Sequence, residues 1–256
     1  MSDRIDLNAD LGESFGAWTM GNDEALLDLV TSANIACGFH AGDPMVMSRT
    51  VALCRRKDVG IGAHPGFDDL RGFGRRRIHG MTQEEVTALL LYQIGALQAI
   101  ARGQGRKVRH VKLHGALGNM ASEEAHYADA YVAAARAADP ELIVVAMTTT
   151  ELEKAVTRAG MPLARELYAD RAYNPDGTLV SRGRPDSMIH DPHEAADRVL
   201  RMVQEQAIAA HDGSRIRAEG DTVCVHGDGP EALRMAETIR NRLERAGIAV
   251  GRFGQD

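Results

Sequence analysis

The residues of this chain that could carry out chemistry occur in six short polar groups, and each group follows an apolar segment of strand-like length. The groups are Asn8-Ala9-Asp10-Leu11-Gly12-Glu13, Phe39-His40-Ala41-Gly42-Asp43, Ala63-His64-Pro65-Gly66, Val111-Lys112-Leu113-His114-Gly115-Ala116, Ala169-Asp170-Arg171-Ala172-Tyr173 and Val225-His226-Gly227-Asp228-Gly229. Parallel βα folds place their chemistry at the carboxyl ends of the strands. The pattern therefore predicts one active site that all six groups share.

Carboxylates and imidazoles dominate the first three groups. Asp10 and Glu13 could ligate a hard divalent cation or act as a general base, although Asp10 could instead bond the backbone of its own turn. Asp10, His40 and His64 together would suit a mixed carboxylate and imidazole metal site. The same side chains could equally bind a substrate by hydrogen bonds, because their spacing matches no compact zinc motif. A bound divalent metal is therefore one of two open hypotheses.

The fourth group adds a cation. Lys112 and His114 flank Leu113, so on a strand they would point to the same side. An ammonium inside a barrel needs an anionic partner, which could be Asp10, Glu13 or a ligand. The alternative is a purely structural ion pair. Together, the first four groups give the predicted catalytic set of Asp10, Glu13, His40, His64, Lys112 and His114.

Anion binding is expected from arginines and from groups near helix starts. The segment 72–77 contains three consecutive arginines after two glycines, and Arg171 offers a planar fork for a carboxylate or phosphate. Asp43 and Asp228 could instead be simple helix caps. Cys37 could be a nucleophile, although a small buried filler is the ordinary role of a free cysteine. Substrate or phosphate binding is predicted for Asn8, Asp43, Arg75, Asp170, Arg171, Tyr173, His226 and Asp228.

Strand-like and helix-like segments alternate along the chain. The expected strands are Ile5–Leu7, Ser32–Ala36, Val59–Ala63, His110–Leu113, Leu142–Met147, Leu163–Tyr168 and Thr222–Val225. The expected helices are Asp43–Lys57, Thr82–Arg102, Ser122–Ala138, Thr149–Ala159, Asp191–Ala209 and Pro230–Ala246, and residues 171–184 form a long loop or hairpin. This order predicts an α/β fold, an irregular (βα)7 barrel in a single domain over residues 1–256. A doubly wound open sheet is the alternative, without its usual glycine fingerprint.

Composition limits the partners. The net charge of −6 argues against nucleic acid, whose phosphates demand a basic surface. The chain has no apolar run long enough to span a membrane, and its first residues are polar rather than typical of a signal peptide. Three cysteines without a paired spacing favour a reducing, cytoplasmic location over a disulfide framework.

The polar groups, taken with several flanking stretches, resemble one known family almost end to end. The stretches are Ile5–Glu13, Ser32–Asp43, Gly62–Phe67, Gly72–Arg76, Tyr92–Leu97, Lys112–Leu117, Ala169–Tyr173, Leu179–Arg182 and Val223–Asp228. They are similar to the family of 5-oxoprolinase A subunits, also called the LamB/YcsF family. Two positions depart from its pattern: Leu113 replaces a usual proline and Gly118 a usual tyrosine. Leu113 should leave a more regular strand, and Gly118 should remove an aromatic wall, so substrate fit is the property that these changes affect.

The resemblance implies a barrel similar to those of glycoside hydrolases and deacetylases. It also implies a component of an ATP-dependent 5-oxoprolinase, which opens the lactam of 5-oxo-L-proline to L-glutamate while ATP is cleaved to ADP and phosphate. Such chains act with subunits B and C, and the ATP could bind this chain or a partner. Two alternatives stay open: a metal-dependent, carbohydrate deacetylase-like hydrolase, and a non-catalytic subunit that binds the lactam.

Overall fold

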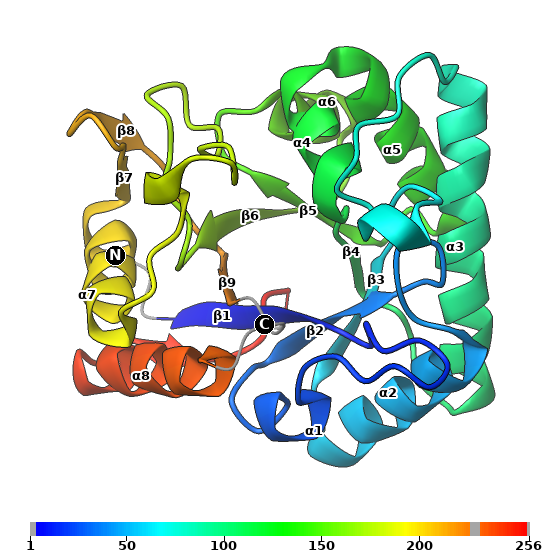
Figure 1. Cartoon of the computed structure of the whole chain (residues 1–256), viewed down its shortest axis with the longest axis horizontal. Coiled ribbons are helices and arrows are strands. Elements are labelled where there is room, and N and C mark those ends of the chain that lie inside the picture. The colour runs from blue at the N-terminus through cyan, green and yellow to red at the C-terminus, as the bar shows by residue number, and fades with distance from the viewer. Residues whose placement is uncertain (1–3, 226–230, 255–256) are drawn as a thin grey trace.

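Seven parallel strands among the described residues close into a barrel. The computed structural model describes residues 4–225 and 231–254. The barrel strands are β1 (Arg4–Leu11), β2 (Ser32–Ala36), β3 (Gly60–His64), β4 (His110–Val111), β5 (Ile143–Met147), β6 (Leu163–Tyr168) and β9 (Thr222–Val225). Each strand pairs with the next, and β9 pairs with both β6 and β1, which closes the ring (Figure 1). The predicted (βα)7 barrel is confirmed, and the open sheet is excluded.

Helices surround this ring of strands (Figure 1). They are α1 (Asp23–Leu26), α2 (Pro44–Lys57), α3 (Gln83–Gly103), α4 (Gly115–Glu123), α5 (Ala125–Ala138), α6 (Glu151–Ala159), α7 (Pro192–Glu205) and α8 (Ala232–Arg245), with short 3-10 turns η1 (Leu70–Gly72) and η2 (Pro185–Ser187). The predicted caps at Asp43 and Thr82 are confirmed, because both side chains accept backbone N–H groups of the helix that follows. No helix within residues 4–225 and 231–254 is long and apolar enough to cross a membrane.

Several predicted element boundaries were wrong. The strand expected over Ile5–Leu7 runs from Arg4 to Leu11, so Asn8 and Asp10 lie within it. The expected helix from Ser122 is two helices, because Glu124 is extended (φ −129°, ψ 120°) and separates α4 from α5. The helix expected to reach Ala209 ends at Glu205, and the next residues pair as β7 (Ala207–Ala209) with β8 (Arg215–Arg217). The fourth strand ends at Val111, so Leu113 lies beyond it and does not lengthen it. The expected helix start at Pro230 lies outside the described residues.

Smaller pairings complete the fold. β10 (Ala249–Val250) pairs in parallel with the first residues of β1, outside the closed ring. The segment 171–184 is partly a hairpin, as predicted, because Tyr173 bridges Leu179 in antiparallel fashion. A second antiparallel bridge joins Arg171 to Met188. These bridges hold the segment beside the end of β6.

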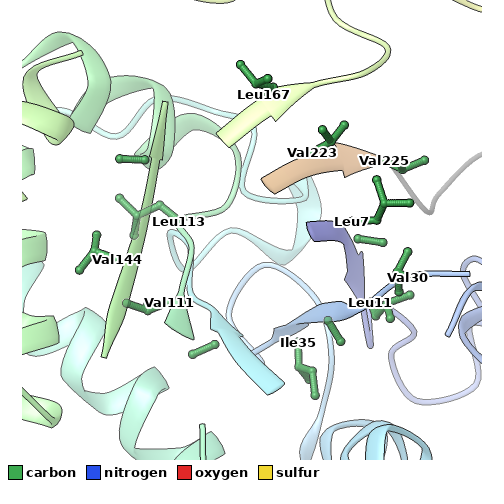
Figure 2. Packing of buried hydrophobic residues seen from close by; sticks show 14 of the residues in the cluster. Leu7, Leu11, Val30, Ile35, Val111, Leu113, Val144, Leu167, Val223 and Val225 are labelled. Carbon is green, nitrogen blue, oxygen red and sulfur yellow. The ribbon is translucent and has the colours of Figure 1, made fainter. Parts of the chain in front are cut away.

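Side chains alternate between the two faces of the barrel wall. Leu7 and Leu11 of β1 and Val223 and Val225 of β9 belong to the hydrophobic core that the outer helices cover, and Figure 2 shows their side chains directed away from the ring. The residues between them face the interior, and many are polar: Asp6, Asn8, Asp10, Ser32, Asn34, His64, His110, Glu166, Thr222 and Cys224. The barrel is therefore apolar outside and polar inside.

One glycine makes room for this polar interior. A Cβ atom on Gly62 of β3 would lie 2.0 Å from Nε2 of His110, far closer than a Cβ atom approaches a non-bonded neighbour. The His110 ring can lie over β3 and reach β2 only because position 62 has no side chain. Its Nε2 then lies 2.9 Å from Oδ1 of Asn34. Gly62 is thus part of how the interior is packed.

Candidate active site

The predicted catalytic groups converge at the carboxyl ends of the strands. A cavity of about 390 Å³ opens there, and its wall includes Asp10, Glu13, His64, Lys112 and His114. Asp10 comes from β1, Glu13 from the turn after it, His64 from the last position of β3, and the other two from the residues after β4. Parallel strands explain the meeting, because all their carboxyl ends lie at the same rim.

Lys112 is the centre of a buried ion cluster. Its Nζ lies 3.0 Å from Oδ1 of Asp10 and 2.9 Å from Oε1 of Glu166. Nζ also lies 3.0 Å from Sγ of Cys224. Burial opposes the charge, but the negative groups around Nζ outweigh it and hold the pKa of Lys112 well above its usual range. The lysine is a fixed cation that orients Asp10, and of the partners expected for it Asp10 is the one found.

Below the rim, hydrogen bonds link this cluster into the barrel. Asn34 donates through Nδ2 to Oδ1 of Asp10 at 2.9 Å and to Oδ1 of Asn8 at 2.7 Å. Asn8 in turn donates to Oε1 of Glu166 at 3.0 Å. The Oδ1 oxygen of Asp10 is therefore held by both an amide and an ammonium. Its other oxygen, Oδ2, lies 3.3 Å from Nε2 of His64.

Two histidines, His64 and His114, each turn one ring nitrogen toward the other. Nδ1 of His64 lies 2.9 Å from the carbonyl oxygen of Lys112, and Nε2 of His114 lies 2.8 Å from that of Phe73. A carbonyl only accepts, so each of these nitrogens must carry its hydrogen. The remaining nitrogens, Nε2 of His64 and Nδ1 of His114, lie 3.0 Å apart. In neutral rings each of these two nitrogens carries a lone pair and no hydrogen. Burial lowers the pKa of His114 to about 3.

A third imidazole completes the cluster. The His40 ring stacks on that of His114, with ring centres 3.7 Å apart and planes within 3°. Both of its nitrogens are buried, and neither has a hydrogen-bond partner in the described part of the chain. Burial, and then the two neighbouring histidines, lower the pKa of His40 well below its usual range. Its Nε2 lies 3.8 Å from Oε1 of Glu13, and that oxygen is also 3.8 Å from Nδ1 of His114.

Glu13, His40, His64 and His114 could hold a metal ion. Each offers one ligand atom, and these four atoms lie within 4.8 Å of one another. The sequence predicted a metal set of Asp10, His40 and His64. The structure places Glu13 and His114 in the cluster as well, whereas Asp10 stands beside it, bonded to Lys112.

A glycine turn allows the histidines to pack so closely. Gly74 has a positive φ of +61°, and a Cβ there would lie 2.8 Å from both the His40 and the His114 side chains. The same turn fixes the start of α4, because the carbonyl of Gly74 accepts the N–H of Ala116 at 2.9 Å. The segment 72–77, which was predicted to bind anions through its arginines, therefore also allows the close packing of His40 and His114.

Arginines lie around the mouth of the cavity. Arg75, Arg77, Arg171 and Arg182 all contribute to its wall. Arg77 forms two hydrogen bonds with Glu123, and the Arg75 guanidinium lies 4.9 Å from the centre of the Phe73 ring. Arg171 is buried and donates to the carbonyl of Val180 at 2.7 Å, so it also fastens the segment 171–184. This rim favours an anionic ligand.

Other predicted binding residues lie elsewhere or serve the framework. Asp43 caps α2 and accepts the N–H of Gly16, and these hydrogen bonds lower its pKa. Tyr173 is buried in the core, where its hydroxyl accepts the N–H of Tyr168. The cavity wall does not include Tyr173, Asp43 or Asp170. Cys37 is the buried filler, with burial raising its pKa to about 12. His226 and Asp228 lie outside the described residues.

Three residues of the network were missed by sequence reasoning. Glu166, Asn34 and His110 are all buried and hydrogen-bonded inside the barrel. The available signal was a polar residue within an apolar strand, at Glu166 in Leu163–Tyr168 and at Asn34 in Ser32–Ala36. Such a residue facing the barrel interior must find a partner there.

The fold and site define a (βα)7 barrel with a buried pocket of carboxylates, histidines and one lysine at the strand ends. The chain belongs to the LamB/YcsF family, whose profile matches residues 5–255. A relative from Rhodopseudomonas palustris, named as the A subunit of 5-oxoprolinase, is 52% identical over 250 residues, 98% of each chain. A relative from Ruegeria pomeroyi with the same name is 50% identical over 250 residues and also covers 98% of each chain.

Solved structures agree with the fold. A crystal structure titled lactam utilization protein, from Thermus thermophilus, has a TM-score of 0.92 and 44% identity, and it covers 98% of this chain and 100% of its own. A more distant match is titled a putative cellobiose-phosphate cleavage protein, from Enterococcus faecalis, with a TM-score of 0.58 and 16% identity. It covers 98% of this chain and 97% of its own, and it bears on the fold alone.

Proposed function

We propose that this chain is the component of an ATP-dependent 5-oxoprolinase that contains the lactam-opening site. One observation carries the proposal: the carboxylate, lysine and histidine groups of the family-wide match line a single cavity below a rim of arginines. Its volume of about 390 Å³ is in the range of small-molecule sites. The names of relatives over half identical to this chain support the same assignment.

Asp10 is the residue best placed to activate water. Lys112 and Asn34 hold its Oδ1, which fixes the carboxylate, while Oδ2 lies beside the histidine cluster. A water beside Oδ2 would give up a proton as it attacks the lactam carbonyl. The C–N bond of the ring then breaks, and the nitrogen becomes the amine of L-glutamate when it takes up a proton. Lys112 acts as a positioning residue for Asp10.

The arginine rim fits the charges of the reactants. 5-Oxo-L-proline carries a carboxylate, and a lactam whose oxygen has been phosphorylated by ATP carries more negative charge still. Arg75 and Arg182 line the cavity mouth, where either anion would enter. A lactam is a poor electrophile, and phosphorylation of its oxygen by ATP activates the ring carbon toward the first water. Breaking of the C–N bond then leaves an amine and an acyl phosphate, and a second water cleaves the acyl phosphate to L-glutamate and phosphate. Subunits B and C are the proposed partners, and the sequence of this chain contains no phosphate-binding loop of the GxxxxGK[ST] type.

The test measures ADP and L-glutamate released from 5-oxo-L-proline and ATP. The full chain is assayed alone, with subunits B and C, and in mixtures from which each component is omitted. His64→Ala is compared with His126→Ala, since His126 is exposed on α5 and is not part of the cavity wall. We expect turnover only with this chain present, and at least about a 100-fold loss in His64→Ala alone. A complex that turns over equally well without this chain would refute the proposal.

The same assay distinguishes a catalytic role of this chain from a non-catalytic one. If the chain binds 5-oxo-L-proline but His64→Ala leaves turnover of the complete mixture unchanged, the site presents the lactam to a partner instead.

A metal-dependent hydrolase is the second candidate, and the Glu13–His40–His64–His114 cluster favours it. This function predicts that the chain alone releases acetate from an N-acetylated sugar without ATP. Turnover that requires both ATP and the partner subunits would exclude it.

A further inference from the structure

The histidine cluster has two features that are unfavourable in a site without a metal ion. Nε2 of His64 and Nδ1 of His114 face each other at 3.0 Å, and carbonyl acceptors have already fixed the hydrogens on the opposite nitrogens. Two lone pairs at this distance repel each other. Beside them His40 is buried with both nitrogens unpartnered in the described part of the chain. Leaving a buried polar group unpaired in this way is unfavourable.

We propose that His64 Nε2 and His114 Nδ1 bind one divalent transition-metal ion, with the Glu13 carboxylate and the His40 ring completing its ligands. The hydrogen bonds to the carbonyls of Lys112 and Phe73 are the outer contacts that metal-binding histidines usually make, since they fix the tautomer and aim the bare nitrogen at the ion. Both rings are thus prepared for a cation before it arrives. The proposal concerns binding only and does not depend on the lactam reaction.

The spacing of the two nitrogens fits ligands on one ion. Two nitrogens about 2.1 Å from a metal are separated by about 3.0 Å at a right angle and about 3.4 Å at a tetrahedral angle. The observed separation is 3.0 Å, and the two rings are nearly perpendicular, at 89°. The separation therefore corresponds to two ligands of one ion at nearly a right angle.

Glu13 and His40 lie next to the position that the ion would take between His64 and His114. Oε1 of Glu13 is 3.8 Å from His114 Nδ1 and 3.8 Å from His40 Nε2, close enough to reach the ion by a small side-chain movement. The His40 ring is parallel to that of His114, so it joins the set by turning out of the stack. Asp10 is left as a carboxylate beside the ion, held by Lys112.

The ligand types select the class of metal. Three imidazoles and one carboxylate suit Zn²⁺, Co²⁺ or another first-row ion, whereas Mg²⁺ and Ca²⁺ prefer oxygen ligands. A proton shared between His64 and His114 is the competing explanation of their short contact. It would relieve that pair but leave both nitrogens of His40 without a partner, whereas one ion would relieve the pair and also give one His40 nitrogen a partner.

The experiment titrates the full chain, freed of metal by dialysis against a chelator, with Zn²⁺, Co²⁺ and Mg²⁺. Binding is followed by calorimetry, by the visible spectrum of bound Co²⁺ and by metal analysis after gel filtration. We expect one Zn²⁺ or Co²⁺ per chain, a Co²⁺ spectrum typical of nitrogen ligands, and binding of Mg²⁺ at least about 100-fold weaker. Absence of saturable Zn²⁺ and Co²⁺ binding to the folded wild type would overturn the proposal in favour of the shared proton.

Variants locate the site. His64→Ala and His114→Ala are each expected to weaken Zn²⁺ binding at least about 100-fold, and the nearly isosteric Glu13→Gln about 10-fold. His126→Ala removes an exposed histidine and should bind as the wild type does. Circular dichroism establishes whether each variant is folded. If an alanine variant is not folded, the Zn²⁺ affinity of Glu13→Gln is the measurement that tests the site. Unchanged affinity in the folded His64→Ala or His114→Ala chain would show that the metal binds elsewhere and refute the assignment. A 5-oxoprolinase assay that fails would leave these results unaffected.

Discussion

The interior of the barrel and its rim are both polar and buried, but their hydrogen bonds differ. In the interior, Asp6 accepts from Ser32 at 2.6 Å and from Thr31 at 2.7 Å, and His110 bonds Asn34. At the rim, His64 and His114 turn lone pairs toward each other, and His40 has no partner in the described residues. A satisfied network holds a structure together. An unsatisfied one indicates what the site is built to bind.

The largest expected difference is in activity, and two aspartates of β1 test it. Asp10 and Asp6 share the inner face of this strand, one at the rim and one below it. Asp10→Asn should lower kcat/KM of the complete 5-oxoprolinase mixture by about 10²–10⁴, because the general base is removed. Asp6→Asn should leave kcat/KM close to that of the wild type. Equal losses in both folded variants would mean that the rim has no special chemical role.

Much of this contrast could be expected from the sequence. The polar groups at strand ends located the rim, since parallel strands must bring their carboxyl ends together, and the buried lysine at position 112 demanded an acid, which is Asp10. The second acid, Glu166, was missed because finding it requires knowing that β6 lies across the barrel from Lys112. The tautomers of His64 and His114 depend on carbonyls brought close only by the fold.

The misplaced helix boundary has a similar cause. Ser122-Glu123-Glu124 looks like a helix start, but α4 begins earlier, at Gly115. Its first turn is fixed by the carbonyl of Gly74, far away in sequence. Ser122 then lies within α4 and donates to the carbonyl of Gly118 at 2.9 Å. Local propensity cannot reveal a start that a distant loop determines.

The second prediction compares a buried ion cluster with one at the surface. Lys112→Met would leave Asp10 and Glu166 without their ammonium, and we expect the free energy of unfolding to fall by about 3–5 kcal/mol. Lys107→Met removes a half-exposed lysine that lies 2.8 Å from Glu141, and the expected loss is at most about 1 kcal/mol. Urea denaturation near neutral pH measures both. A Lys112→Met chain as stable as Lys107→Met would show that the barrel cluster contributes little.

The third prediction concerns the pH dependence of stability. Burial raises the pKa of Asp6 to about 6, and hydrogen bonds from Ser32, Thr222 and Thr31 only partly offset this. The unfolded chain has an aspartate pKa near 3.8, so between about pH 4 and pH 6 the folded state binds more protons. The contribution of Asp6 to the free energy of unfolding must therefore fall as the pH rises through this window, by about 3 kcal/mol in total.

Asp6→Asn removes this titration. The free energy of unfolding of the variant minus that of the wild type should thus increase by about 3 kcal/mol between about pH 4 and pH 7. Denaturant titrations at several pH values measure this difference, which cancels the contributions of all other groups. A flat difference would mean that Asp6 is ionised as easily in the folded chain as in the unfolded one.

The smallest effect tests how tightly the interior is packed. Gly62→Ala places a methyl group 2.0 Å from His110 Nε2, so the ring must move and its hydrogen bond to Asn34 is lost. We expect a loss of about 1–3 kcal/mol in the free energy of unfolding. Gly95→Ala is the matched control, because Gly95 is exposed within α3 and nothing lies within 4 Å of the position that its new methyl group would take. It should gain about 0.5–1 kcal/mol, since alanine favours the helix. If both substitutions stabilise the chain, the interior has room to spare, and the satisfied network below the rim is less tightly packed than its distances indicate.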